Sequence, residues 1–409
     1  MRTLDQILTK KDYSRKTPAS LFYKDSPLWQ KLLTIGCVIF LAGAGLGEWK
    51  PINSAVGGLP KAISLGVIGL AMLYTLFYPD EKRLRELWKP TLLYMSLMAV
   101  LFFWSMVIWI ESFAAVSSMI RSCSKIVFQS IAILTAVALV YLFREKAIEL
   151  FTISICIANT AIMLLSIPGY GFAASIQSLV TCLITFGDAD GYALQLEIHD
   201  LTFVFGQMIL YYAVFAPRTT RQEKRKRWLY LLLCCWFFLV GMKRIAIPAV
   251  VLFVLIALLL RKRKVPGWFY PAVGVCCILF FLAFLYCVRY GVISRLLNSF
   301  GIDMMGRDYL WSMANPYYEF SITYIGRGFE YVDTIIAQWY NDGLINQPYP
   351  FHNDILKVFV EVGFPGFLLW SSIQYVLTPL FWQRYADQET TLLYLSELGY
   401  MTVTYLTDN

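Results

Sequence analysis

The sequence predicts an all-α protein that crosses a membrane many times. Hydrophobic residues make up 58% of the 409 residues and charged residues only 15%, whereas a soluble domain carries about 25% charged residues. Several apolar runs reach the ~20 residues that an α-helix needs to span a hydrocarbon core. Aromatic residues contribute 16%, and many Trp and Tyr lie near the ends of the apolar runs, as in interfacial belts.

The apolar runs predict 11 or 12 transmembrane helices, because the chain ends at or inside the last run and leaves a further segment open. The spans are expected at 29–47, 58–78, 91–110, 126–143, 149–167, 200–216, 228–242, 245–260, 268–288, 355–382 and 391–406. Residues 1–28 are polar and basic, so we interpret them as a cytoplasmic tail and not as a cleavable signal peptide.

The loops between these spans divide the chain further. Residues 29–288 hold the first nine spans, 289–354 form a large outer loop with short helices, and 355–409 form the C-terminal spans. Long ordered loops are usually functional, so we expect the catalytic groups in 289–354. A second long outer segment runs from Tyr170 to His199.

The distribution of Lys and Arg predicts the orientation in the membrane. Basic residues concentrate in the N-terminal tail and in alternate loops, at 80–89, 144–146, 218–227, 261–264 and Arg384, whereas 169–199 contains no Lys or Arg. By the positive-inside rule this basic set is cytoplasmic, and the N-terminus lies inside. The net charge of +8 is explained in this way and does not indicate a nucleic-acid partner.

The nine cysteines do not indicate a metal site. Most lie in or beside apolar runs, where a cysteine acts as a small hydrophobic residue, and the sequence contains no Cys-x-x-Cys pair. We therefore expect neither a metal nor a cofactor. Cys123 and Cys182 are both expected on the outer side, which leaves a disulfide between them open.

The large outer loop contains four arginines and no lysine; the arginines are Arg289, Arg295, Arg307 and Arg327. Arginine binds phosphate oxygens through two parallel hydrogen bonds, whereas lysine acts as a point charge. The loop is therefore typical of a site for a phosphorylated lipid headgroup. The alternative is that these arginines pair with acidic residues of the same loop.

A second group of charges lies in the short outer turn that contains Lys243 and Arg244. Charges at membrane depth usually face a cavity or a partner, and we favour a site role for Arg244. Lys243 either joins it or extends into the headgroup layer. His199, at the outer entry to another span, is better explained as an interfacial packing residue.

His352 is the candidate catalytic base, because it precedes a span on the outer side and a neutral imidazole can accept the proton of a sugar hydroxyl. Asn353 or Asp354 can cap the helix that follows. Glu361 lies deeper in that helix and is expected to orient partner groups or to cap a neighbouring helix. Gly363 and Gly366 permit a close helix approach or a break near Pro365.

Three separated motifs resemble the family of O-antigen ligases and Wzy-type polymerases. The first is His352-Asn353-Asp354-Ile355-Leu356 followed by Glu361-Val362-Gly363-Phe364-Pro365-Gly366. The second is Gly306-Arg307-Asp308-Tyr309-Leu310-Trp311 followed by Gly326-Arg327-Gly328. The third, Lys243-Arg244, resembles the family's Ser-Arg pair but has lysine in place of serine. The resemblance covers roughly residues 201–370.

The resemblance implies a metal-independent glycosyltransferase in the bacterial cytoplasmic membrane, with its active site on the outer face. The implied donor is a glycan on undecaprenyl diphosphate, and a chain-length regulator is an expected partner. His352 would act as the general base. The expected substrate-binding residues are Lys243, Arg244, Arg307, Arg327, Asn353 and Glu361.

Three functions stay open at this point. A polymerase would join lipid-linked repeat units, and we favour this function because the N-terminal half matches the family poorly. A ligase would transfer the finished glycan to another acceptor. A polysaccharide or lipid transporter would place ionisable residues deep inside broken, pseudo-symmetric helices, whereas the charges here concentrate at the outer ends of the spans, with Glu361 as the main exception.

Overall fold

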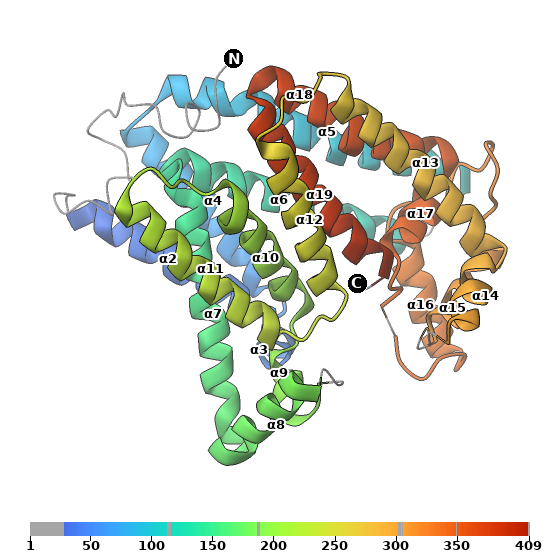
Figure 1. Cartoon of the computed structure of the whole chain (residues 1–409). Coiled ribbons are helices and arrows are strands. Elements are labelled where there is room, and N and C mark those ends of the chain that lie inside the picture. The colour runs from blue at the N-terminus through green and yellow to red at the C-terminus, as the bar shows by residue number, and fades with distance from the viewer. Residues whose placement is uncertain are drawn as a thin grey trace. The chain divides into compact units, whose positions relative to one another are not determined.

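The computed structural model describes residues 28–112, 116–185, 189–301, 304, 306–348 and 350–407. Nearly all of the expected cytoplasmic tail therefore lies outside the described residues. The described part of the chain is helical and contains no β-strand, which confirms the predicted fold class. By their contacts, the described residues form two compact units (Figure 1).

The described residues of the first unit fall within Met1–Thr91, Ile131–Arg263 and Ala386–Met401. Its helices are α2 (Leu28–Gly47), α3 (Lys50–Ala55), α4 (Leu59–Phe77), α7 (Lys146–Tyr170), α8 (Phe172–Thr185), α9 (Gly191–Leu196), α10 (His199–Leu210), the π-helix η2 (Tyr211–Phe215), α11 (Arg221–Val240) and α12 (Ala246–Arg261).

The second unit falls within Leu92–Ser130, Lys264–Tyr385 and Thr402–Asn409. Its helices are α13 (Phe269–Arg289), α14 (Val292–Ser299), α15 (Arg307–Ala314), the 3₁₀-helix η3 (Asn315–Tyr317), α16 (Tyr331–Asn341), α17 (Asp354–Ser372), the π-helix η4 (Ile373–Leu377) and α18 (Thr378–Tyr385). Helices α5 (Glu81–Ser112), α6 (Val116–Phe143) and α19 (Gln388–Thr407) contribute residues to both units.

Each of the 11 predicted spans coincides with helical structure, apart from one or two residues at the ends of some spans. Seven helical segments of the described chain are long and apolar enough to cross a membrane: α2, α4, α5, α6, α7, α13 and the continuous run from α17 to α18. The other four predicted spans correspond to α10 with η2, α11, α12 and α19. These helices are shorter, or carry charged residues in their first turns.

Small residues permit the close helix packing of the first unit. Helix α2 packs against α4 and α7, and α10 packs against α11 and α12. A Cβ atom at Gly45 of α2 would lie 2.9 Å from the Cβ of Ala158 in α7, and one at Gly206 of α10 would overlap the phenol of Tyr400. Lipid tails are as apolar as these helices, so helix association depends on such close van der Waals packing.

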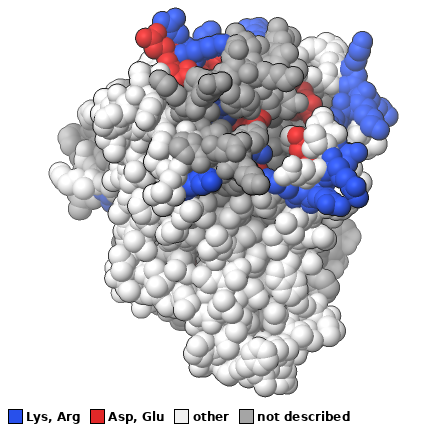
Figure 2. All heavy atoms as spheres, turned by 90° about the vertical axis from the view of Figure 1, so that its left-hand side faces the viewer, with Lys and Arg blue, Asp and Glu red and all other residues white. Residues whose placement is uncertain are grey.

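The loops that the basic pattern assigns to one side contact one another at one end of the first unit. Arg144 pairs with Asp80 at 3.3 Å, and Glu149 at the start of α7 binds Lys226 of α11 at 2.7 Å. Lys and Arg gather at the upper end of the face in Figure 2, above a broad surface that lacks charged side chains. Such a surface is suited to contact with lipid, and the chain is a multi-pass membrane protein.

The two long segments that are expected on the outer side contain short helices. The segment 170–199 forms α8 and α9, and the loop 289–354 forms α14, α15, η3 and α16. Helix α15 continues directly into η3, which ends at Tyr317. In the second unit, α13 packs against α17 and η4, and Gly274 of α13 permits this contact because a Cβ there would overlap the Tyr375 carbonyl.

Candidate active site

Helix α17 begins at the predicted cap and is interrupted at the predicted glycine. The Oδ1 of Asn353 accepts a hydrogen bond from the Leu356 N–H at 2.9 Å, so Asn353 is the N-cap. Gly363 has φ +67° and ψ −174° inside the helix, a backbone conformation that is essentially restricted to glycine. Carbonyl groups in the turn before Gly363 therefore lack their hydrogen bonds within the helix and are open to other donors.

The loop 324–328 binds these exposed carbonyl groups. The Arg327 and Gly328 amides donate to the Glu361 carbonyl at 3.0 and 2.8 Å, and the Phe364 amide donates to the Tyr324 carbonyl at 2.7 Å. A Cβ at Gly363 would lie 2.2–2.4 Å from backbone atoms of this loop. The backbone of Gly326-Arg327-Gly328 is thus in direct contact with the backbone around Gly363 in the second unit.

Arg327 is exposed and held at one nitrogen. Its Nε donates to the Tyr317 carbonyl at 2.9 Å, and its backbone is fixed by the contacts with α17. A guanidinium fixed through Nε keeps the paired geometry of its terminal nitrogens, which is the geometry that recognises phosphate. Arg327 therefore has the exposure and the fixed direction that a ligand of an anionic group requires.

Arg307 and His352 come from segments that are bonded to each other. Arg307 is the first residue of α15, and Trp311 follows one helical turn later on the same face. The Trp311 Nε1 donates to the carbonyl of Phe351 at 3.2 Å, directly before His352. His352 has φ +53°, a left-handed conformation that costs an L-residue roughly 1–2 kcal/mol.

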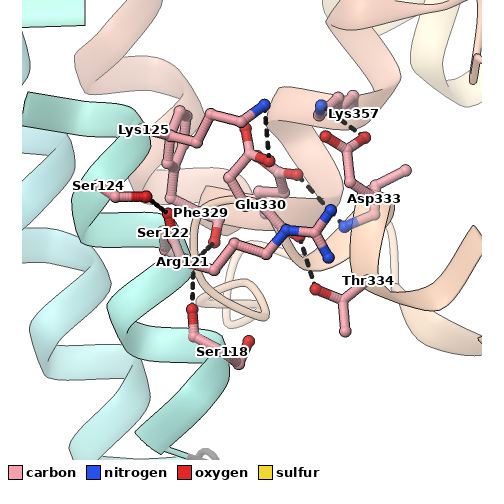
Figure 3. A network of polar contacts seen from close by, with 12 residues as sticks. Ser118, Arg121, Ser122, Ser124, Lys125, Phe329, Glu330, Asp333, Thr334 and Lys357 are labelled. Carbon is pink, nitrogen blue, oxygen red and sulfur yellow. Dashed lines mark hydrogen bonds and ion pairs between the residues drawn. The ribbon is translucent and has the colours of Figure 1, made fainter. Parts of the chain in front are cut away.

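A partly buried charge network connects this loop to α6, α16 and α17 (Figure 3). The Lys357 Nζ donates to Asp333 at 2.8 Å, and Lys125 of α6 pairs with Glu330 at 3.4 Å. Glu361, 1% exposed, accepts from the Val332 N–H at 3.3 Å in the first turn of α16. Of the two roles expected for Glu361, the structure therefore gives it the cap of a neighbouring helix.

Two acidic residues of the loop, Glu330 and Asp333, have opposite electrostatic environments. Burial, together with the adjacent Asp333 carboxyl, raises the pKa of Glu330. Burial would raise the pKa of Asp333 too, but the charge of Lys357, the hydrogen bonds with Glu330 and Lys357 and the charge of Lys125 together outweigh burial and lower that pKa. Both acids pair with lysines of membrane helices, Lys125 and Lys357, whereas one alternative interpretation of the sequence paired the loop's acids with its arginines. Arg289 and Arg327 donate to backbone carbonyls.

Lys243 and Arg244 belong to the first unit. Lys243 is only 6% exposed, and its Nζ lies 2.7 Å from Glu197 Oε1 and 2.8 Å from His199 Nε2. Through these two contacts, Lys243 connects the turn 241–245 to the N-terminal end of α10. Arg244 lies beside it, and of the two residues only Arg244 is exposed.

No cysteine forms a disulfide, Cys123 and Cys182 included. The described residues also contain no group of three or more His, Cys, Asp or Glu side chains arranged to hold a metal ion.

Residues 229–371 match the O-antigen ligase family model. This confirms the resemblance drawn from the three motifs, since the matched segment includes each of them. The family description implies a glycosyltransferase-type enzyme that processes glycans in a membrane. The comparison with curated proteins found no match. The matched segment runs from α11 to α17 and does not include the helices before α11.

Sequence reasoning missed the supporting residues on α5 and α6, which lie outside the matched segment. The Trp104 Nε1 donates to the carbonyls of Ile325 and Val362, at 3.2 and 2.8 Å. The Ser122 Oγ donates to the Phe329 carbonyl at 2.6 Å. In the sequence these residues belong to apolar runs without a motif. The only signal was the basic pair Arg121 and Lys125, which directly precedes the predicted span 126–143.

Proposed function

We propose that this chain polymerises oligosaccharide repeat units carried on undecaprenyl diphosphate, at the outer face of the cytoplasmic membrane. The observation that carries the proposal is the bond from Trp311 to the Phe351 carbonyl. It joins the helix that Arg307 begins to the residue before His352, inside the segment that matches the O-antigen ligases. A base and a cation are the two groups that glycosyl transfer from a lipid diphosphate requires.

In the proposed reaction, the acceptor hydroxyl gives its proton to the His352 imidazole as its oxygen attacks the anomeric carbon of the donor. The bond from that carbon to the diphosphate oxygen breaks, and the electron pair leaves with the diphosphate. Arg307 and Arg327 stabilise the negative charge that develops there. Attack opposite the leaving group inverts the anomeric carbon.

Arg244 is proposed independently, from its charge and its exposure on the first unit, as a ligand of an anionic lipid headgroup. Lys243, which is buried against Glu197, would act by holding the turn that carries Arg244. Asn353 and Glu361, both buried, would support the substrate site through the helix ends that they cap.

The test compares lipid-linked glycan from cells that carry wild type, His352→Ala or His352→Asn at matched membrane levels. Asparagine tolerates the left-handed backbone but cannot act as a base, so it separates the loss of the base from a change of fold. We expect both variants to lose at least about 100-fold in rate, the usual contribution of a general base, and to accumulate single repeat units.

The same measurement distinguishes the two enzyme activities. If full-length chains persist on the carrier lipid and their transfer to another acceptor stops, the protein is a ligase, the activity that the family description names. An unchanged glycan ladder in both variants would contradict the role of His352 and the proposed proton transfer.

A further inference from the structure

The loop that carries Arg327 lies between α17 and the outer parts of α5 and α6, all within the second unit. On the α17 side it binds the carbonyls of Val360 and Glu361. On the other side, the Phe329 amide donates to the Ser105 Oγ at 3.2 Å, and a Cβ at Gly328 would overlap the Trp109 indole. The loop is therefore held on two faces, one of them built from residues outside the family match.

Lys125 makes the one ion pair that the structure describes between α6 and this loop. Its Nζ lies 3.4 Å from the Glu330 carboxylate, and the two side chains are 45% and 6% exposed. Figure 3 shows Lys125 reaching over Glu330 from α6, while Lys357 binds Asp333 from the other side. A buried carboxylate needs a partner charge, because removal of water penalises the ionised form.

Glu330 has a backbone conformation that needs support. Its φ is +66°, and it is the N-cap residue of α16, three positions after Arg327. A left-handed conformation at a non-glycine residue persists only where the surroundings fix it. The Lys125 pair, the Ser122 bond to the Phe329 carbonyl and the Thr334 bond to the Glu330 carbonyl supply that support.

We propose that Lys125 is a positioning residue: its ion pair with Glu330 fixes the loop 326–330 and thereby directs the Arg327 guanidinium toward the diphosphate. The proposal rests on the function proposed above. It also explains how helices outside the matched segment contribute to the site. A change in α5 or α6 would alter the direction of Arg327 without any contact with the substrate.

Hydrogen exchange of the backbone amides in 326–332 tests the positioning directly, in the full-length protein in lipid nanodiscs and without substrate. Lys125→Met keeps the length of the side chain and removes its charge. We expect exchange of the Arg327 and Gly328 amides to rise about tenfold. Lys125→Arg should restore the wild-type rate, because arginine can form the same pair.

Arg121→Met is the matched control, since Arg121 has the same charge one turn away on α6. Its contact in this network is made by its carbonyl, which accepts from the Ser124 Oγ and which the substitution retains. Exchange should be unchanged in this variant. An equal rise in Arg121→Met and Lys125→Met, or no rise in either, would overturn the specific role of Lys125.

Binding of undecaprenyl diphosphate to the same nanodiscs tests the link to Arg327. We expect Lys125→Met to weaken binding about tenfold in the wild-type background and not at all in Arg327→Met, because coupled residues are not additive. Equal losses in both backgrounds would overturn the step through Arg327. If Arg327→Met leaves lipid binding and glycan transfer unchanged, the proposed role of Arg327 is wrong. The hydrogen-exchange experiment would still show whether Lys125 fixes the loop 326–330.

Discussion

His352, Glu330 and Met242 adopt left-handed backbone conformations, and each lies at or beside a candidate site residue. They are three of the four non-glycine residues with positive φ in the described chain. Each such conformation costs about 1–2 kcal/mol, and strained residues cluster at functional sites. The backbone strain therefore occurs at or next to two motif residues, His352 and Lys243. It also marks Glu330, which belongs to no motif, as a candidate functional position.

Glu48 allows a test of the electrostatics at the other end of the first unit. It is half-buried directly after α2, and burial, followed by the negative charge of Asp200, raises its pKa. A raised pKa favours the protonated carboxyl in the folded state. The stability that this provides is complete below the unfolded pKa, about 4.3, and is lost as the pH rises through the folded pKa.

We predict that Glu48→Gln melts about 1–2 °C above wild type at pH 7.5 and that this difference disappears near pH 4. Thermal unfolding in detergent at a series of pH values measures it. The control is Glu81→Gln, at a carboxylate that is 81% exposed, where we expect a change of less than about 0.5 kcal/mol. A difference between Glu48→Gln and wild type that grows toward low pH would contradict the prediction.

At the scale of elements, the decisive feature is the interruption of α17 at Gly363. A helix that ends inside a membrane protein must satisfy its last carbonyls, and here the amides of the loop 324–328 do so. The motif glycines are therefore structural residues that permit two backbones to meet. Arg327 lies between Gly326 and Gly328, and the backbone contact of this loop with α17 leaves its side chain exposed.

Gly363→Ala should disrupt this contact. The added Cβ would lie 2.2–2.4 Å from loop backbone, and the φ/ψ combination suits only glycine, so we expect a loss of about 3 kcal/mol or more and no glycan transfer. Gly36→Ala in α2 is the control, because its Cβ would meet nothing within 4 Å. That variant should be neutral or more stable by about 0.5–1 kcal/mol. Comparable melting of the two variants would exclude the backbone contact as the reason for the glycine.

At the scale of the whole molecule, the charge pattern divides the loops into two sets, and contacts in the first unit join loops of the same set. Arg144 binds Asp80 and Lys226 binds Glu149 at one end, whereas Lys243 binds Glu197 in the other set. This agreement supports the predicted alternation of the spans. The side on which each set lies stays a prediction.

Single cysteines in a background without the nine native ones can test that side. We predict that Asp342→Cys, at an exposed position in the large loop, reacts with a membrane-impermeant maleimide in spheroplasts. Lys224→Cys, exposed near the start of α11, should react only after the membrane is opened. Labelling of Lys224→Cys in sealed spheroplasts would reverse the proposed topology and place His352 inside the cell.

The sequence by itself determined the membrane class, the helical spans, a helix cap at Asn353 or Asp354 and the resemblance to the O-antigen ligase family. These properties follow from local composition and spacing, because apolar length and capping chemistry act within a few residues of chain. The tertiary structure alone assigned Glu361 to the cap of α16, selected Asn353 as the cap of α17 and buried Lys243 against Glu197. It also brought Lys125 to Glu330, more than 200 positions along the chain. Such pairings depend on which helices pack together, and an apolar run does not encode its neighbours, since lipid and protein offer it equally apolar surroundings.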